Sequence, residues 1–138
     1  RAGRTADPAN WRVAKSIFVA DDMATAKEYA LGPQSPYRYY YSQLLTKMKK
    51  HGRTNLFKAD QTMADDEVTL DGVLEDCVLW GTPDKVADDL LALREEVGDF
   101  GKLLYAGKDW TDVELGRNSM IKLAEKTMPI VNAAIGKP

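Results

Sequence analysis

The chain has 138 residues, of which 44% are hydrophobic and 29% charged, and its net charge at pH 7 is −2. This is the composition of a folded domain, and the length is sufficient for one domain with a real core. The charge balance gives no basic footprint for nucleic acid. No apolar run reaches the roughly 18 residues that a membrane span requires. We therefore expect a soluble globular domain with no nucleic-acid or membrane partner.

Two residue types that often carry chemistry are almost missing from the sequence. Its single cysteine, Cys77, excludes an internal disulfide and fits a reducing cytoplasm, where we expect it to be a small buried hydrophobe. The single histidine, His51, follows a run of lysines, which is typical of a solvated helix end. The sequence therefore predicts neither a metal site nor a serine–histidine–acid triad.

The first part of the chain predicts a strand followed by a helix. Residues 12–20 alternate and then become apolar, which is typical of a strand that is buried at its far end. Asp21 or Asp22 can cap a helix over residues 22–31, which would stop at Gly32 and Pro33.

Residues 37–50 predict a second helix, with Tyr37, Tyr40 or Tyr41, Leu44, Leu45 and Met48 on its apolar face. The adjacent Tyr39, Tyr40 and Tyr41 point about 100° apart on a helix, so they cannot all line one pocket. Packing or an interface is the favoured interpretation, and one substrate-facing tyrosine is the alternative. Residues 53–66 show no clear period. We interpret Asp65, Asp66 and Glu67 as the charged first turn of a helix over residues 68–76, with Asp65 or Asp66 as its cap, and not as a metal site.

The stretch over residues 81–110 is the most informative part of the chain. Thr82 and Pro83 begin a helix over residues 83–97, and Gly98 is placed to end it in the left-handed conformation. Residues 100–106 are short and apolar, which is typical of a strand covered on both faces. A long amphipathic helix should follow over residues 112–128 and on towards residue 135, with a kink or break at Pro129.

Several of these segments resemble one known family. The segments GTPDKVADDLL, FGKLLYAGKDW and SMIKLAEKTMPIVN resemble the C-terminal part of luciferase-like flavin-dependent monooxygenases, especially limonene- or alkane-type members. YYYSQLLTKMKK and the opening WRVAKSIFVADDMATAKEYA add to the likeness, which covers nearly the whole chain. The resemblance implies an α/β, helix-rich fold that represents the C-terminal βα units of an incomplete (β/α)8 TIM barrel. A complete barrel needs about 250 residues, so the chain would correspond to its last third to last two-fifths. Residues 33–67 would form a helical and loop insertion near the barrel mouth.

The family likeness also implies an activity. Reduced FMN, supplied by a separate flavin reductase, would react with O₂ to oxygenate a small apolar organic substrate, while the protein positions the flavin and excludes water. Ligands of such folds bind beyond the carboxyl ends of the strands. There we expect a substrate or cofactor rim made of Tyr105, Lys108, Asp109 and Trp110. Trp110 would cover the flavin or the substrate, and Lys108 would attract an anionic group. A surface turn at Lys108 and Asp109, with Trp110 packed on the closing helix, is the equal alternative.

Two other functions fit the same residues. A deazaflavin-dependent oxidoreductase of the same superfamily would transfer hydride without oxygen, and a non-catalytic α/β module would persist through self-association. We expect two βα patterns and no closed barrel, so Ile17, Val19, Leu103 and Leu104 should lack part of their cover. A homo-oligomer or a rearranged helical packing would hide them. We also expect that the 138 residues alone neither bind FMN tightly nor turn over substrate.

Overall fold

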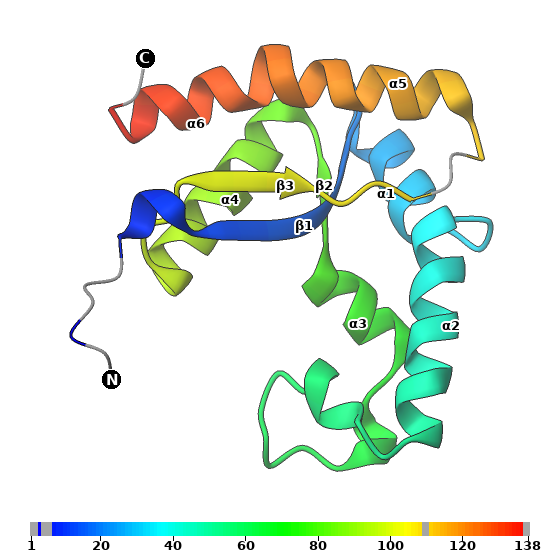
Figure 1. The fold of residues 1–138 in the computed structure, drawn as a ribbon. Helices are drawn as coiled ribbons and strands as arrows, with labels where there is room; N and C mark the ends of the chain where they lie inside the picture. Colours follow the sequence, from blue (N-terminus) through cyan, green and yellow to red (C-terminus); the bar gives the residue numbers. More distant parts are fainter. Residues whose placement is uncertain (1–2, 4–6, 109–110, 137–138) are drawn as a thin grey trace.

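The computed structural model describes Gly3, residues 7–108 and residues 111–136. Within this part of the chain a three-stranded parallel sheet has the order β2-β1-β3 (Figure 1). Its long central strand is β1 (Arg12–Val19), and the short strands are β2 (Val78–Gly81) and β3 (Lys102–Tyr105). Residues 16–19 of β1 pair with β2, whereas residues 12–15 pair with β3. The two short strands therefore flank opposite halves of β1.

The strands predicted near residues 12–20 and 100–106 are confirmed, but β2 was not predicted. Residues 78–81, Val-Leu-Trp-Gly, lie between two helices, and the second of these begins with the strong signals of Thr82 and Pro83. The run is only four residues long, so its β-branched and aromatic content is a weak pattern beside those helix signals. The sequence therefore predicts two strands, whereas the sheet of the described residues has three.

The five predicted helices lie close to their predicted positions, and the last of them is divided into α5 and α6. In chain order, α1 (Met23–Leu31), α2 (Pro36–Lys50) and α3 (Leu70–Cys77) connect β1 to β2, and α4 (Pro83–Val97) connects β2 to β3. After β3 come α5 (Val113–Lys122), a π-helical turn (Leu123–Thr127) and α6 (Met128–Ala134). The closing helix is thus interrupted immediately before Pro129, whose missing N–H and bulky ring disfavour a regular α-turn. None of the helices among the described residues has the length and hydropathy needed to cross a bilayer.

The start of α3 differs from the prediction. Thr69, and not Asp65 or Asp66, caps this helix by accepting a hydrogen bond from the Gly72 N–H. The two aspartates lie in a separate 3-10 turn (Asp65–Glu67). The Glu67 carboxylate closes this turn by accepting from the Ala64 N–H at 2.7 Å.

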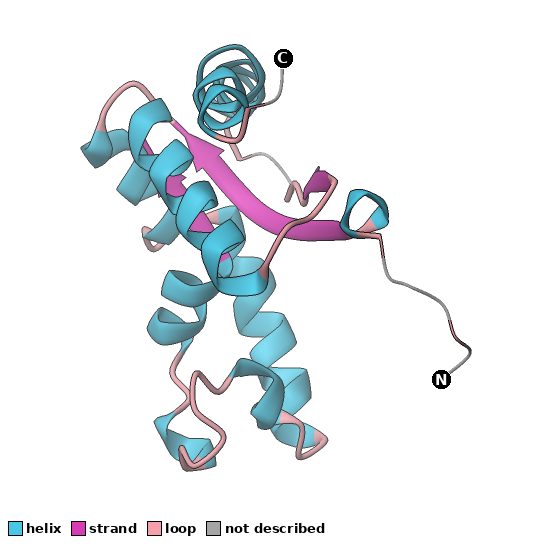
Figure 2. Ribbon diagram, turned by 90° about the vertical axis from the view of Figure 1, so that its left-hand side faces the viewer, coloured by secondary structure: helices cyan, strands magenta, loops and turns pink. Residues whose placement is uncertain are grey.

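Side chains that alternate along β1 divide the interior into two cores. Phe18 and Ala20 pack with residues of α1, α2 and α3, whereas Ile17 and Val19 pack with residues of α4, the π-helical turn and α6. The views agree with this layering: the segment that leads to the C-terminus is seen end-on above the sheet, and the α2 and α3 region extends below it (Figure 2). Helices therefore cover both faces of the sheet.

This arrangement differs from the local order expected in a (β/α)8 barrel. In a barrel, consecutive strands are neighbours and all helices lie outside, so β2 would lie between β1 and β3. Here β2 and β3 lie on opposite sides of β1. Two right-handed crossovers that run in opposite directions require helices on opposite faces, as observed. The α/β, helix-rich class is confirmed, whereas the incomplete barrel is not.

Burial corrects two expectations about the strands. Ile17 and Val19 are 0% and 1% exposed, because the chain's own helices cover them. In β3, Leu103 is half-buried, but Leu104 is 47% exposed. The prediction that β3 is covered on both faces is therefore wrong for the described residues, because helices pack on one of its faces only.

The turn from α4 into β3 depends on two glycines. Gly98 ends α4 with φ 86° and ψ 179°, so its φ is positive as predicted, but ψ is extended and the conformation is not the left-handed helical one. Residues other than glycine rarely adopt this combination of backbone angles. Gly101 approaches the Ala9 backbone so closely that an added Cβ would collide with the Ala9 carbonyl oxygen.

Candidate functional site

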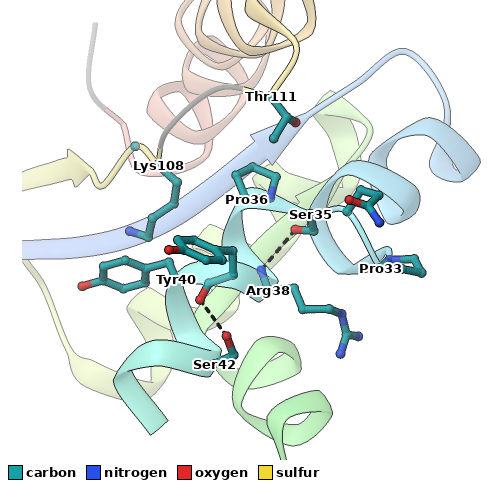
Figure 3. Close-up of a pocket in the computed structure, with 11 residues that line it drawn as sticks. Pro33, Ser35, Pro36, Arg38, Tyr40, Ser42, Lys108 and Thr111 are labelled. Carbon is teal, nitrogen blue, oxygen red and sulfur yellow. Dashed lines mark hydrogen bonds between the residues drawn. The ribbon is translucent and has the colours of Figure 1, made fainter. Parts of the chain in front are cut away.

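A pocket of about 930 Å³ lies beyond the carboxyl end of β3, and parallel α/β folds place their ligands beyond such strand ends (Figure 3). One wall is the turn between α1 and α2 with the first two turns of α2. The other wall is the segment that follows β3. The residues that line it are Pro33, Gln34, Ser35, Pro36, Arg38, Tyr39, Tyr40, Ser42, Gly107, Lys108 and Thr111.

The wall formed by α2 is held by Ser35. Its buried hydroxyl donates to the Ala30 carbonyl at 2.7 Å and accepts from the Tyr37 and Arg38 N–H groups at 3.1 and 3.3 Å. Pro36 occupies the first helical position, where no N–H is needed. The turn is therefore fixed by the chain's own hydrogen bonds.

Arg38 lies at the pocket but is engaged by the protein. Its Nε and Nη2 donate to the Leu31 carbonyl at 3.0 and 2.8 Å, and Nη2 also forms an ion pair with Asp71 at 2.7 Å. These contacts join the end of α1, the start of α2 and the start of α3. Arg38 therefore stabilises the wall and carries a compensated charge.

Lys108 reaches across the pocket from the other wall. Its Nζ lies 4.2 Å from the centroid of the Tyr40 ring and 5.7 Å from that of Tyr41, and it donates to the Ala106 carbonyl at 3.3 Å (Figure 3). A cation over an aromatic face is attracted by the ring quadrupole. Partial burial lowers the pKa of the Lys108 ammonium, an effect that the nearby Cys77 thiol partly opposes.

Behind this contact lies a buried layer of hydroxyl groups. The Tyr41 hydroxyl and the Ser16 hydroxyl are 3.0 Å apart, and the Tyr37 hydroxyl donates to the Ile17 carbonyl at 2.8 Å. Burial raises the pKa of Tyr41, although its bond with Ser16 opposes the shift, and burial also raises the pKa of Tyr37 well above its usual range. Cys77 beside Tyr41 has a raised pKa, again mainly through burial, so its thiol is protonated at neutral pH.

A second depression of about 440 Å³ adjoins the pocket and shares Gln34, Ser35, Pro36 and Thr111 with it. It extends to Tyr29, whose ring stacks on Phe18 at 4.0 Å and meets Tyr37 edge-on at 6.5 Å. The buried Tyr29 hydroxyl has no hydrogen-bond partner among the described residues.

The structure separates the residues predicted to form one rim. Lys108 lines the pocket, whereas Tyr105, the last residue of β3, lines a different depression. This depression is a small apolar groove that Tyr105 lines with Leu103, Met120, Leu123, Ala124 and Met128. Asp109 and Trp110 lie outside the described residues. Within the described ranges, no three His, Cys, Asp or Glu residues lie close enough together to hold a metal ion.

The family likeness places residues 33–67 near a barrel mouth, but the sequence predicts no site residue in the turn between α1 and α2. Proline and serine at residues 33–36 are typical of a turn, and a turn signal alone does not identify a ligand-binding residue. The tyrosine run was assigned mainly to packing, and the structure divides it. Tyr41 is 8% exposed and belongs to the core, whereas Tyr39 and Tyr40 are 71% and 44% exposed and line the pocket.

Comparisons with known proteins find two monooxygenases that are similar in sequence. The chain is 34% identical over 133 residues to a 4-hydroxyprotoasukamycin monooxygenase from Streptomyces nodosus subsp. asukaensis. It is 26% identical over 112 residues to a 3,6-diketocamphane 1,6-monooxygenase from Pseudomonas putida. These matches cover 96% and 80% of this chain but 33% and 29% of the two relatives. No family model matches the sequence.

A solved structure shares the fold. It is the oxygenating constituent of 3,6-diketocamphane monooxygenase from Pseudomonas putida, a type II Baeyer-Villiger monooxygenase in complex with FMN, with a TM-score of 0.77 and 23% identity. The match covers 94% of this chain and 36% of that one. The chain thus spans about a third of the length of the relatives it matches. The sequence matches support a relationship to monooxygenases, and the solved structure shows that the chain shares the fold of an FMN-binding one.

Proposed function

We propose that this chain contributes one wall of the active site of a flavin-dependent monooxygenase, which uses reduced FMN and O₂ to oxygenate a small apolar organic substrate. The observation that carries the proposal is the 34% identity to a monooxygenase over 96% of the chain. The pocket supports it independently, because it lies beyond the carboxyl end of β3 and such folds bind ligands beyond strand ends. The likeness to limonene- or alkane-type enzymes stays a prediction.

The lining fits one side of a flavin or of its substrate. The exposed rings of Tyr39 and Tyr40 offer aromatic faces, and Lys108 offers a positive charge for an anionic group. The hydroxyls of Ser42 and Thr111 offer hydrogen bonds. When bound, reduced FMN would supply the activation of O₂, and the protein would contribute binding, orientation and exclusion of water.

We further propose that these 138 residues need additional walls to work. The pocket has the volume of a small-molecule site, but such sites bury most of the surface of their ligand, and this one is open to solvent. Among the described residues, β2 and β3 each have a free edge, which leaves room for further strands. We expect the isolated chain to show no saturable micromolar binding of FMN, measured by flavin fluorescence, and no turnover when a flavin reductase and O₂ are supplied.

A chimera tests the function itself. The matched region of the FMN-binding diketocamphane enzyme would be replaced by this chain, and FMN binding and reductase-dependent O₂ uptake with a ketone substrate would be measured. We expect the folded chimera to bind FMN and to oxygenate, while a truncated enzyme without this region does neither. A folded chimera that behaves like the truncated enzyme would contradict the proposal. Hydride transfer from a reduced deazaflavin without O₂ uptake would favour the deazaflavin alternative.

Self-association is the second candidate role, and we propose a homo-oligomer located in the cytoplasm. Leu104 on β3 and Met120 and Ile121 on α5 are each more than 40% exposed. Exposed apolar side chains beside an open strand edge favour association. Light scattering at high protein concentration tests this expectation, and a monodisperse monomer would contradict it.

A further inference from the structure

Among the described residues that line the pocket, one positive charge is not balanced by an ion pair. Two basic side chains contribute, Arg38 and Lys108, and none of the described lining residues is acidic. Arg38 is compensated by Asp71 at 2.7 Å. Lys108 forms no ion pair with a described residue, and its nearest groups are two aromatic rings and a backbone carbonyl. The described lining is therefore positive.

The hydrogen-bonding capacity of Lys108 is also incompletely used. An ammonium group has three donors and no acceptor. One N–H is directed to the Ala106 carbonyl, at a long 3.3 Å, and the face of Tyr40 occupies a second direction. The third donor has no partner among the described residues. Because the group is partly buried, water compensates it less well than it would a surface lysine, and a ligand oxyanion would interact with it strongly.

The remaining lining restricts the rest of the ligand. The rings of Tyr39 and Tyr40 and the apolar surfaces of Pro33 and Pro36 suit an apolar or planar body. Arg38 is already engaged by Leu31 and Asp71, so Lys108 is the described cation that remains for an anionic group.

We infer that this pocket selects a ligand that carries an oxyanionic group on an apolar or aromatic body, with Lys108 as its specificity-determining residue. The inference rests on the proposed function in one respect: the oxyanion would belong either to the oxygenated substrate, as a carboxylate or enolate, or to the flavin, as its phosphate. The chemistry is shared, and the experiment separates the two sources.

The test compares matched ligands on the full 138-residue chain by NMR titration at millimolar concentration. The first pair is 2-naphthoate and 2-naphthamide, which differ in charge and hardly in shape; the second is FMN and riboflavin, which differ in the phosphate. We expect at least tenfold tighter binding of the anionic member of one pair, a preference lost in Lys108→Met and kept in Lys108→Arg. Preference for naphthoate assigns the oxyanion to the substrate, and preference for FMN assigns it to the flavin.

Lys102→Met is the matched control, because Lys102 is an exposed lysine of β3 that does not line the pocket. It should leave the anion preference unchanged. Binding of both pairs without preference, or a preference that survives Lys108→Met, would overturn the inference. Neither measurement needs flavin reduction or O₂, so a failure of the monooxygenase proposal would appear separately.

A pH series gives a second measurement in case Lys108→Met does not fold. The wild-type preference should decline as the pH rises towards the lowered pKa of Lys108, whereas Lys108→Arg, which keeps its charge, should retain it. Tyr40 and Tyr41 of α2 and Cys77 at the end of α3 face the same ammonium, and their ionisation is common to both proteins. An equal decline in both proteins would overturn the assignment to Lys108.

Discussion

The two cores on either side of β1 are built from different kinds of residue. The core beneath α4 and α6 is aliphatic, with Ile17, Val19, Val86, Ala87, Leu90, Leu123 and Val131 as its buried members. The core that packs on α1, α2 and α3 contains four buried aromatic residues, Phe18, Tyr29, Tyr37 and Tyr41. The pocket adjoins the aromatic core, because residues of the first turns of α2 contribute to both.

The difference between the aliphatic and the aromatic core suggests that they have different roles, one in stability and the other also in the geometry of the pocket. An aliphatic core stabilises through area and close packing, without directional demands. The aromatic core adds hydrogen bonds that fix positions: Tyr37 to the Ile17 carbonyl, and Tyr41 to Ser16. Both bonds tie α2, which forms a wall of the pocket, to β1. We therefore expect changes in the aliphatic core to alter stability alone, and changes in the aromatic core to alter the pocket as well.

The largest expected effect is on the aliphatic side. Leu90→Ala should lower the free energy of unfolding by about 3 kcal/mol, because the side chain is 3% exposed and its removal leaves a cavity. Chemical denaturation measures this. Val97→Ala at the end of the same helix is the control, since Val97 is 44% exposed and the change should stay below about 0.5 kcal/mol. Equal effects of the two substitutions would contradict the described core.

The aromatic side offers a comparison of two buried tyrosines. Tyr37→Phe leaves the Ile17 carbonyl without its donor and should cost about 2 kcal/mol, whereas Tyr29→Phe removes a hydroxyl that has no partner among the described residues and should be neutral or stabilising. Denaturation of both variants checks the difference. A Tyr29→Phe protein as destabilised as Tyr37→Phe would mean that the Tyr29 hydroxyl has a partner beyond the described residues.

Much of the fold was predictable because its signals are local. Helix caps such as Asp22, Ser35 and Thr82 depend on residues within one turn, and the predicted helices they begin were confirmed to within one residue. The strand β2 and the strand order depend on pairing partners that are far away in the chain. The local sequence of residues 78–81 gives no information about these partners. The partial exposure of β3 has the same origin, since cover is a property of the whole assembly of elements.

The site was predictable only in part for a related reason. Ligands of parallel α/β folds bind beyond strand ends, so the end of β3 predicted a site there, and Lys108 does line the pocket. Tyr105 is the last residue of β3, however, whereas Lys108 lies in the segment that follows, and the two line different depressions. Ser35, Tyr40 and Thr111 come from segments up to 76 residues apart, 111 − 35, and only the tertiary fold brings them together.

Alkaline pH should affect the aromatic core next. The pKa of Tyr37 is raised by burial, so the unfolded chain, with a tyrosine pKa near 10, loses this proton first. Below about pH 10 the raised pKa has no effect on stability. At pH 11 the free energy of unfolding should be about 1.4 kcal/mol lower through this residue alone. Denaturation at pH 9 and 11 tests it, with Tyr37→Phe as the control. A pH dependence unchanged in that variant would exclude Tyr37 as a cause.

The smallest effects compare the caps of α2 and α4, one beside each core. Ser35 is buried, and its hydroxyl makes three hydrogen bonds at 2.7 to 3.3 Å, whereas the half-buried Thr82 accepts one bond from the Lys85 N–H at 3.5 Å. Ser35→Ala should therefore cost about 1 kcal/mol or somewhat more, and Thr82→Ala about 0.5 kcal/mol.

The two variants should also differ at the pocket. Ser35 holds the turn that faces Lys108, so its loss should weaken the binding of naphthoate, while Thr82→Ala should leave that binding unchanged because the described pocket contains no residue of α4. If Ser35→Ala and Thr82→Ala lost the same stability and bound naphthoate equally well, the cap beside the aromatic core would have no special role in the geometry of the pocket.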